Sequence, residues 1–272
     1  MSDLRAAWQI TLATLQQRRG SLLTFAGIAA AFHFITAVAL ELVGGMESVQ
    51  SSLKSYSPGI QQLLKISPDL QTEYGLQDHF AITWLHPFFI GLCAIYVVGR
   101  SAEALAKDIE TGAVYLLLSR PIPRWTYALG RVGEVGVGMA VILLLSWFGL
   151  VVGVRLAGLE PLPVDRFAVL VVTAWCLFMA LSAVALIVSS VASRTGIAVA
   201  IGTIWTLVTY VLDVIPVTAE SSLAWLNPWH HYFPPSIIAG DSVGWSSLLI
   251  LLAWTVGATW TAMALFTRRD LV

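Results

Sequence analysis

The chain has 272 residues, of which 57% are hydrophobic and only 11% are charged, and its mean hydropathy is +0.79. Soluble domains carry about 25% charged residues, so this composition indicates an integral membrane protein. The net charge of −1 argues against a surface that binds nucleic acid. Both cysteines, Cys93 and Cys176, fall in apolar runs, which argues against a disulfide framework. The length fits one domain over residues 1–272.

The first predicted element is an amphipathic helix over residues 3–19. Its apolar residues repeat at helical spacing: Leu4, Trp8, Leu12 and Leu15. Its arginines lie off that stripe: Arg5, Arg18 and Arg19. This pattern predicts a helix that lies in the membrane interface before the first span.

Six apolar runs then meet the length of about 20 residues that crossing the hydrocarbon core requires. They are placed at residues 22–43, 80–99, 127–154, 167–191, 196–215 and 245–266. An even number of spans puts both chain ends on one side. With the N-terminus inside, 11 of the 15 basic residues fall on the cytoplasmic side and 4 on the outer side. The positive-inside rule therefore predicts an all-α protein with six transmembrane helices and both ends in the cytoplasm.

Two longer segments are predicted on the outer side. Residues 44–79 carry an apolar stripe at helical spacing and two Ser-Pro pairs, which predict broken amphipathic helices on the outer face. They can form a lid that packs on the spans or a segment that handles a substrate. Residues 217–244 are rich in prolines and aromatics, which suits the interface or a short re-entrant pair that neighbouring spans bury.

The long charged segment runs from residue 101 to residue 131, between the second and third spans. Glu103 and Lys107 are four residues apart, in the order that stabilises a helix. Thr111 and Gly112 interrupt this helix, and the prolines at 121 and 123 stop the short apolar run that follows. Residues 101–126 are therefore predicted to form a rigid crosswise segment on the cytoplasmic face, suited to docking onto a soluble partner.

Several ionisable residues fall in or near the predicted spans, where charge is costly. Arg131 and Glu134 are three residues apart and can pair along their helix, or extend to the lipid headgroups. Glu41 and Asp213 lie near the outer ends of their spans and His33 lies in mid-span. These three are candidates for a polar pathway or gate. The alternatives are that the two carboxylates reach the interface and that His33 is a hydrogen-bonded packing residue.

Motifs for catalysis are scarce. The sequence has no G-x-x-x-x-G-K-[ST] phosphate loop, no H-E-x-x-H pattern and no G-x-S-x-G pattern. No metal site is expected, because the histidines lack a convincing ligand spacing. His230, His231 and Asp241 are the residues around which a membrane-embedded enzyme could be built. A purely structural membrane-assembly protein is another alternative to the enzyme.

Residues 110–124 resemble the coupling segment of type-2 ABC-transporter permeases, whose form is E-x-G-T-x-x-x-L-L-S-x-P-I-x-R. Here the run reads ETGAVYLLLSRPIPR, with Ala113 where the family has a small polar residue. The chain end, Phe266 to Leu271, reads FTRRDL and resembles the F-x-R-R-D-[LI] ending of simple members. The layout of spans and loops agrees over essentially the whole chain.

The resemblance implies a permease subunit of an ABC exporter in the bacterial cytoplasmic (inner) membrane. Two copies of a separate ABC ATPase would carry ATP and Mg²⁺, no cofactor is expected in this chain, and a second permease chain would complete a homodimer. Its cargo would be an amphipathic small molecule, peptide or lipid-like compound, and the alternative is a mechanotransmitter that energises an outer-face maturation system. The implied ATPase-docking residues are Glu110, Gly112, Leu116, Leu117, Ser119, Arg120, Pro121 and Arg124.

Overall fold

The computed structural model describes residues 3–57, 59, 75–114, 122–240 and 245–270. Six parts of it are helical, long and apolar enough to cross a membrane: α2 (Arg19–Leu42), α6 with α7 (Leu76–Glu103), α10 (Arg124–Leu156), α11 with α12 (Val164–Val191), α13 (Thr195–Val214) and α16 (Trp245–Arg268). Each agrees with one predicted span to within about one helical turn. The prediction of an all-α protein with six transmembrane helices is confirmed.

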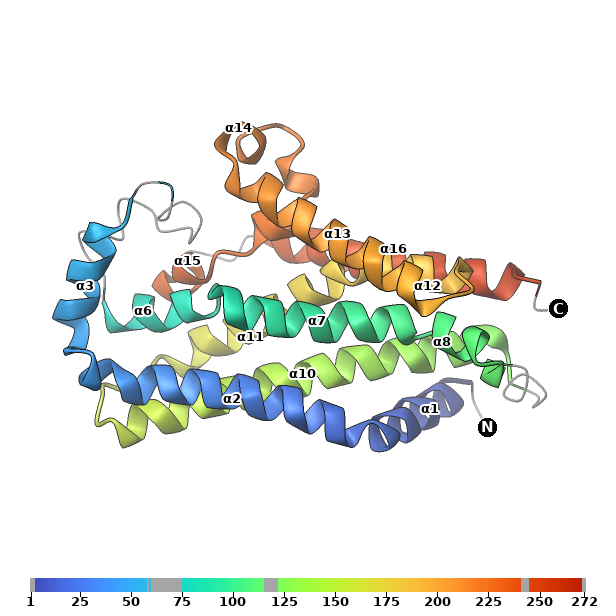
Figure 1. Cartoon of the computed structure of the whole chain (residues 1–272), viewed down its shortest axis with the longest axis horizontal. Coiled ribbons are helices and arrows are strands. Elements are labelled where there is room, and N and C mark those ends of the chain that lie inside the picture. Colours follow the sequence, from blue (N-terminus) through green and yellow to red (C-terminus); the bar gives the residue numbers. More distant parts are fainter. Residues whose placement is uncertain (1–2, 58, 60–74, 115–121, 241–244, 271–272) are drawn as a thin grey trace.

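Both chain ends lie at the same end of the helices, together with α1 (Asp3–Gln17) and α8 (Ala106–Glu110), as Figure 1 shows. The helix α3 (Gly45–Ser55) lies at the opposite end. We call the end that carries both termini the inner end and the opposite one the outer end. That the inner end faces the cytoplasm stays a prediction from the distribution of arginines and lysines.

Two of the six spans are interrupted. The second consists of α6 (Leu76–Thr83) and α7 (Pro87–Glu103). At the start of α7, His86 Nδ1 accepts a hydrogen bond from the backbone N–H of Phe88 at 3.2 Å, while Pro87 occupies the first helical position. The fourth span divides at Ser182 into α11 (Val164–Leu181) and α12 (Ala183–Val191). The Ser182 hydroxyl donates to the carbonyl of Met179, and such bonds bend helices.

The long helix α10 packs against α1 and α2 through glycines. A Cβ added at Gly153 would lie 2.8 Å from the carbonyl oxygen of Phe34, and one at Gly149 would collide with the carbonyl of Ala30. Nearer the inner end, a Cβ at Gly130 would lie 2.7 Å from the carbonyl oxygen of Ala7. Small residues let helix backbones approach closely, which is a main source of association energy between helices in lipid.

Helix α1 turns its small side chains, not its apolar stripe, toward the protein. Ala7, Thr11 and Thr14 are buried, and the Thr11 hydroxyl donates to the carbonyl of Gly130 at 2.9 Å. Leu4 is 66% exposed and Trp8 is 52% exposed. The stripe therefore faces away from the spans, in the orientation that an interfacial helix needs to bury it in lipid.

The outer end is built from short helices: α3, α14 (Pro216–Ala219), the 3-10 turns η1 (Ala224–Leu226) and η2 (Pro228–His231), and α15 (Pro234–Ala239). Trp229 and Tyr232 are buried in the core formed by the spans, so this part of residues 217–244 is anchored among them. Residues 58, 60–74 and 241–244 lie outside the described part of the chain. The helical structure predicted for residues 60–74 therefore stays a prediction, whereas α3 is a helix within the first part of this loop.

Candidate functional site

Charged side chains from α7, from α8 and from the residue that precedes α2 meet at the inner end around Glu103. Its carboxylate pairs with Arg18 at 2.8 Å, with Arg100 at 3.1 Å and with Lys107 at 3.0 Å. The i,i+4 pair of Glu103 with Lys107 confirms the spacing argument from the sequence. Arg18, just before the first span, joins this cluster from 85 residues away, which the sequence did not indicate.

Arg131 and Glu134 do not behave as the sequence predicted. Both are buried, so the prediction that they extend to the headgroups is wrong. Arg131 donates to the Ala104 carbonyl at 2.9 Å and lies 3.5 Å from the Asp108 carboxylate, whereas Glu134 lies 3.9 Å from Arg100. Each side chain therefore joins α10 to another part of the chain: Arg131 to the turn after α7 and to α8, and Glu134 to α7.

The junction between α7 and α8 is held by a serine of the fourth span. Ser189 Oγ donates to the Ala102 carbonyl at 2.7 Å and accepts from the backbone N–H groups of Leu105 at 3.1 Å and Ala106 at 3.0 Å. The first N–H groups of a helix lack partners inside it. Ser189 is thus an N-cap for α8 supplied by another helix, 83 residues away along the chain from Ala106.

Glu110, the first residue of the segment singled out by its motif, caps helix α13. Its carboxylate accepts hydrogen bonds from the Thr195 backbone N–H at 3.0 Å and from the Thr195 hydroxyl at 2.7 Å. These two bonds lower the pKa of Glu110 below its ordinary value, so the group is ionised at neutral pH. A negative charge is also favourable at a helix N-terminus. One end of the segment is therefore attached to the start of the fifth span.

Arg124, at the other end of the segment, caps the end of α16. Its guanidinium donates to the carbonyls of Arg269 at 2.6 Å and Thr267 at 3.4 Å. The Arg269 guanidinium donates in turn to the carbonyls of Ala192 at 2.9 Å and Ser190 at 3.2 Å, at the end of α12. Arginines favour helix C-termini because the last four carbonyls lack partners there. The two motif stretches of the sequence thus meet in space.

The structure places part of the predicted docking segment and leaves part undescribed. Gly112 follows α8 with φ +76°, a conformation that side chains rarely adopt, which explains a glycine at this point. Val114 is fully buried in a small core beside Tyr127 and Phe266. Five of the predicted docking residues lie outside the described part of the chain: Leu116, Leu117, Ser119, Arg120 and Pro121. Their roles stay predictions.

The three candidates for a polar pathway are not brought together. His33 is fully buried, with its ring packed edge-to-face on Phe89 and its Nδ1 atom 3.2 Å from the Ala29 carbonyl, as a packing residue would be. Glu41 is exposed near the end of α2. Asp213 is different: its side chain is only 4% exposed and lies 3.8 Å from His230 Nδ1.

The histidine pair does not form a metal centre with neighbouring ligands. Among the described residues, no group of three or more His, Cys, Asp or Glu side chains is placed to hold a metal ion. His231 lies 2.6 Å from the Trp225 carbonyl and 3.1 Å from the Ser247 hydroxyl, which satisfies both ring nitrogens. Asp241 lies outside the described part of the chain.

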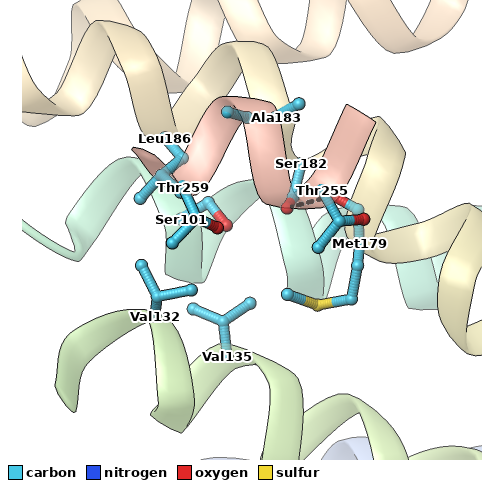
Figure 2. Close-up of a pocket in the computed structure, with 10 residues that line it drawn as sticks. Ser101, Val132, Val135, Met179, Ser182, Ala183, Leu186, Thr255 and Thr259 are labelled. Carbon is cyan, nitrogen blue, oxygen red and sulfur yellow. Dashed lines mark hydrogen bonds between the residues drawn. The ribbon is translucent and has the colours of Figure 1, made fainter. Parts of the chain in front are cut away.

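A cluster of hydroxyl groups lies where the kink of the fourth span meets α7, α10 and α16. Figure 2 shows Ser101, Ser182, Thr255 and Thr259 around it, with Val132 and Val135 of α10 below. The hollow between them is too small for a ligand. It is a packing site where small side chains let four helices meet.

Comparison with known protein families identifies the chain over nearly its full length. The sequence model of a family described as "ABC-2 family transporter protein" matches residues 10–271. The match spans all six transmembrane segments as well as the inner-end contacts described above. No curated protein matches the chain.

Proposed function

Since the chain belongs to the ABC-2 family of transporter membrane proteins, we propose that it is the permease subunit of an ATP-driven exporter. In this proposal a separate ATPase docks on the segment between Glu110 and Arg124 and carries ATP and Mg²⁺, in two copies. A second permease chain completes a homodimer in a bacterial inner membrane. The cargo is an amphipathic small molecule, peptide or lipid-like compound.

One observation carries the coupling role: both ends of the docking segment are hydrogen-bonded to the inner ends of spans. Glu110 holds the start of α13, and Arg124 holds the end of α16. A force on the segment is therefore transmitted to the fifth and sixth spans, and through Arg269 to the fourth. Closure of the ATPase pair would move the segment and favour one packing of the spans over another, because ATP binds the two states with different affinity.

The first test is a mild-detergent purification of the tagged chain from its native membrane, with mass identification of what accompanies it. We expect an ATPase that contains a phosphate loop. Recovery of the chain without any nucleotide-hydrolysing partner contradicts the proposed function.

The second test separates docking from force transmission. Thr195→Ala removes the hydroxyl that holds Glu110 while leaving the Glu110 carboxylate in place for the ATPase. Combined with Arg269→Ala, which removes the guanidinium that reaches the end of α12 and is not among the predicted docking residues, it should leave the ATPase bound but reduce cargo-dependent ATP hydrolysis and transport. Arg268→Ala is the control, since Arg268 is exposed at the same end of α16. Transport by the double variant at the level of this control would refute the coupling role of these contacts.

A further inference from the structure

Glu134 on α10 is a buried carboxylate with few partners. Its side chain is 1% exposed, and Oε1 lies 3.9 Å from Nε of Arg100 on α7, which is too far for a hydrogen bond. Its other oxygen, Oε2, has no hydrogen-bond partner among the residues that the structure describes. A buried charge without close partners is costly, and ionisable residues inside spans commonly have a functional role.

Glu103, at the end of α7, has more partners than it needs. Arg18 lies 2.8 Å from its carboxylate, Lys107 lies at 3.0 Å and Arg100 at 3.1 Å. The Glu103 side chain is also 25% exposed, so that water reaches it. If Arg100 left, two close cations and water would remain, and the loss would be small.

Arg100 lies between the two carboxylates, with Nη1 on Glu103 and Nε toward Glu134. Charge-assisted hydrogen bonds are about 2.7–2.9 Å long, so an approach of about 1 Å would give Glu134 a close partner. Arg18 and Arg131 also act on the Glu134 charge. However, Arg18 is bound to Glu103, and Arg131 is bound to the turn after α7. Arg100 is therefore the cation that Glu134 can gain.

The two helices touch one turn away from this pair. Tyr96 lies four residues before Arg100, and Gly138 lies four residues after Glu134. A Cβ at Gly138 would collide with the Tyr96 hydroxyl. The Arg100 guanidinium carbon is 5.7 Å from the centroid of the Tyr96 ring, which is within the range of a cation–π contact. The guanidinium is thus held where α7 meets α10, and a small movement of either helix decides which carboxylate is nearer.

We propose that Arg100 exchanges between Glu103 and Glu134, and that Glu134 is the positioning residue that gives α7 and α10 two packings. The pair with Glu103 lies within α7 and leaves its place against α10 free, whereas a close pair with Glu134 joins the two helices. Helix shifts of about 1–2 Å are common in switching proteins, and this exchange needs no larger one. That an ATPase drives the exchange rests on the proposed function.

The test records the fluorine NMR spectrum of a trifluoromethyl label on α7, in the purified full-length chain without the ATPase. Ile95→Cys provides the labelling position, because Ile95 is 67% exposed whereas the native Cys93 and Cys176 are buried. This chain should give two resonances, or one averaged resonance if the exchange is fast. Glu134→Gln and Glu103→Gln should change the ratio of the two forms by at least about fivefold each, in opposite directions. An averaged resonance should likewise move in opposite directions.

Glu160→Gln is the matched control and should leave the ratio unchanged, since Glu160 is an exposed carboxylate on the loop between α10 and α11. Thermal unfolding shows whether each variant is folded, and Glu103→Asp replaces Glu103→Gln if the latter is not. Changes in the same direction for the two carboxylates overturn the proposal. An unchanged spectrum in Glu134→Gln overturns it too, because Arg100 then senses no charge at Glu134.

A second measurement adds the ATPase with a non-hydrolysable ATP analogue. The ratio should change in the chain that carries Glu134 and stay fixed in Glu134→Gln, which is held in one form. An equal change in both chains would refute the role of Glu134 in coupling while leaving the proposed function intact, since ATP would still move the spans. Failure of the ATPase to bind contradicts the proposed function instead, and the spectra of the chain alone still decide whether the exchange occurs.

Discussion

The hydroxyl of Ser189 gives the sharpest test of how α8, the helix that leads into the docking segment, is attached to the spans. Ser189→Ala removes the acceptor for the Leu105 and Ala106 N–H groups and the donor for the Ala102 carbonyl. Losing an N-cap costs about 1 kcal/mol, and a buried donor left unpaired costs about 1–3 kcal/mol. Partial relaxation of the junction reduces the sum, so we expect α8 to open more easily by about 2–3 kcal/mol.

Amide hydrogen exchange of residues 104–110, read by mass spectrometry, measures this opening directly. A change of 2–3 kcal/mol corresponds to exchange faster by roughly 30- to 150-fold. Ser190→Ala is the control, because its buried hydroxyl donates only within its own helix, to the Ile187 carbonyl at 2.6 Å. If Ser189→Ala exchanges no faster than Ser190→Ala, the cap supplied by the fourth span does not hold α8 and the reasoning fails.

Two more predictions concern packing and pH. Gly149→Ala should lower the free energy of unfolding by about 1–3 kcal/mol, because the added Cβ meets the Ala30 carbonyl. Gly27→Ala is the control and should not lower the free energy of unfolding, since the space around Gly27 is open. Equal losses for the two variants in steric-trap unfolding would contradict the prediction. Burial lowers the pKa of His231 below its ordinary value of 6.5, so the unfolded chain binds its proton first as the pH falls. Stability should therefore be complete above pH 6.5 and decline below it, down to the lowered pKa. Thermal unfolding of His231→Gln, measured across this pH range, checks the assignment. If the variant loses stability with falling pH as much as the wild-type chain does, another group is responsible.

The spans could be predicted from sequence because each depends on local composition and length. Backbone groups cannot stay unpaired in lipid, so a long apolar run has to be a helix wherever its neighbours lie. Prolines and glycines likewise mark breaks by their own geometry, as at Pro87 and Gly112. Other helices cover the second span far more than the sixth. Both spans nevertheless agree with the prediction, because each depends on its own composition and length.

Apart from the Glu103–Lys107 pair, the contacts at the inner end could not be predicted, because they depend on which helix ends meet. The sequence pairs Arg131 with Glu134 by their spacing, yet Arg131 binds the end of α7 and Glu134 faces Arg100. Ser189 carries no motif, since serine is common in apolar helices. The apolar stripe of α1 predicted an interfacial helix, but not which face of it packs on the protein; that contact depends on the glycines of α10.

The two stretches that resemble permease motifs turn out to act as one structural unit. Arg124 of the docking segment donates to the carbonyl of Arg269, and Arg269 of the chain end donates to the end of α12. These bonds use carbonyls that the helices themselves leave unpaired, as the Glu110 carboxylate uses the free N–H at the start of α13. Such caps can break and form again without opening any hydrogen bond inside a span. In the proposed function, a segment held in this way would shift between two positions while the six helices stay intact, as a coupling element between an ATPase and a membrane pathway requires.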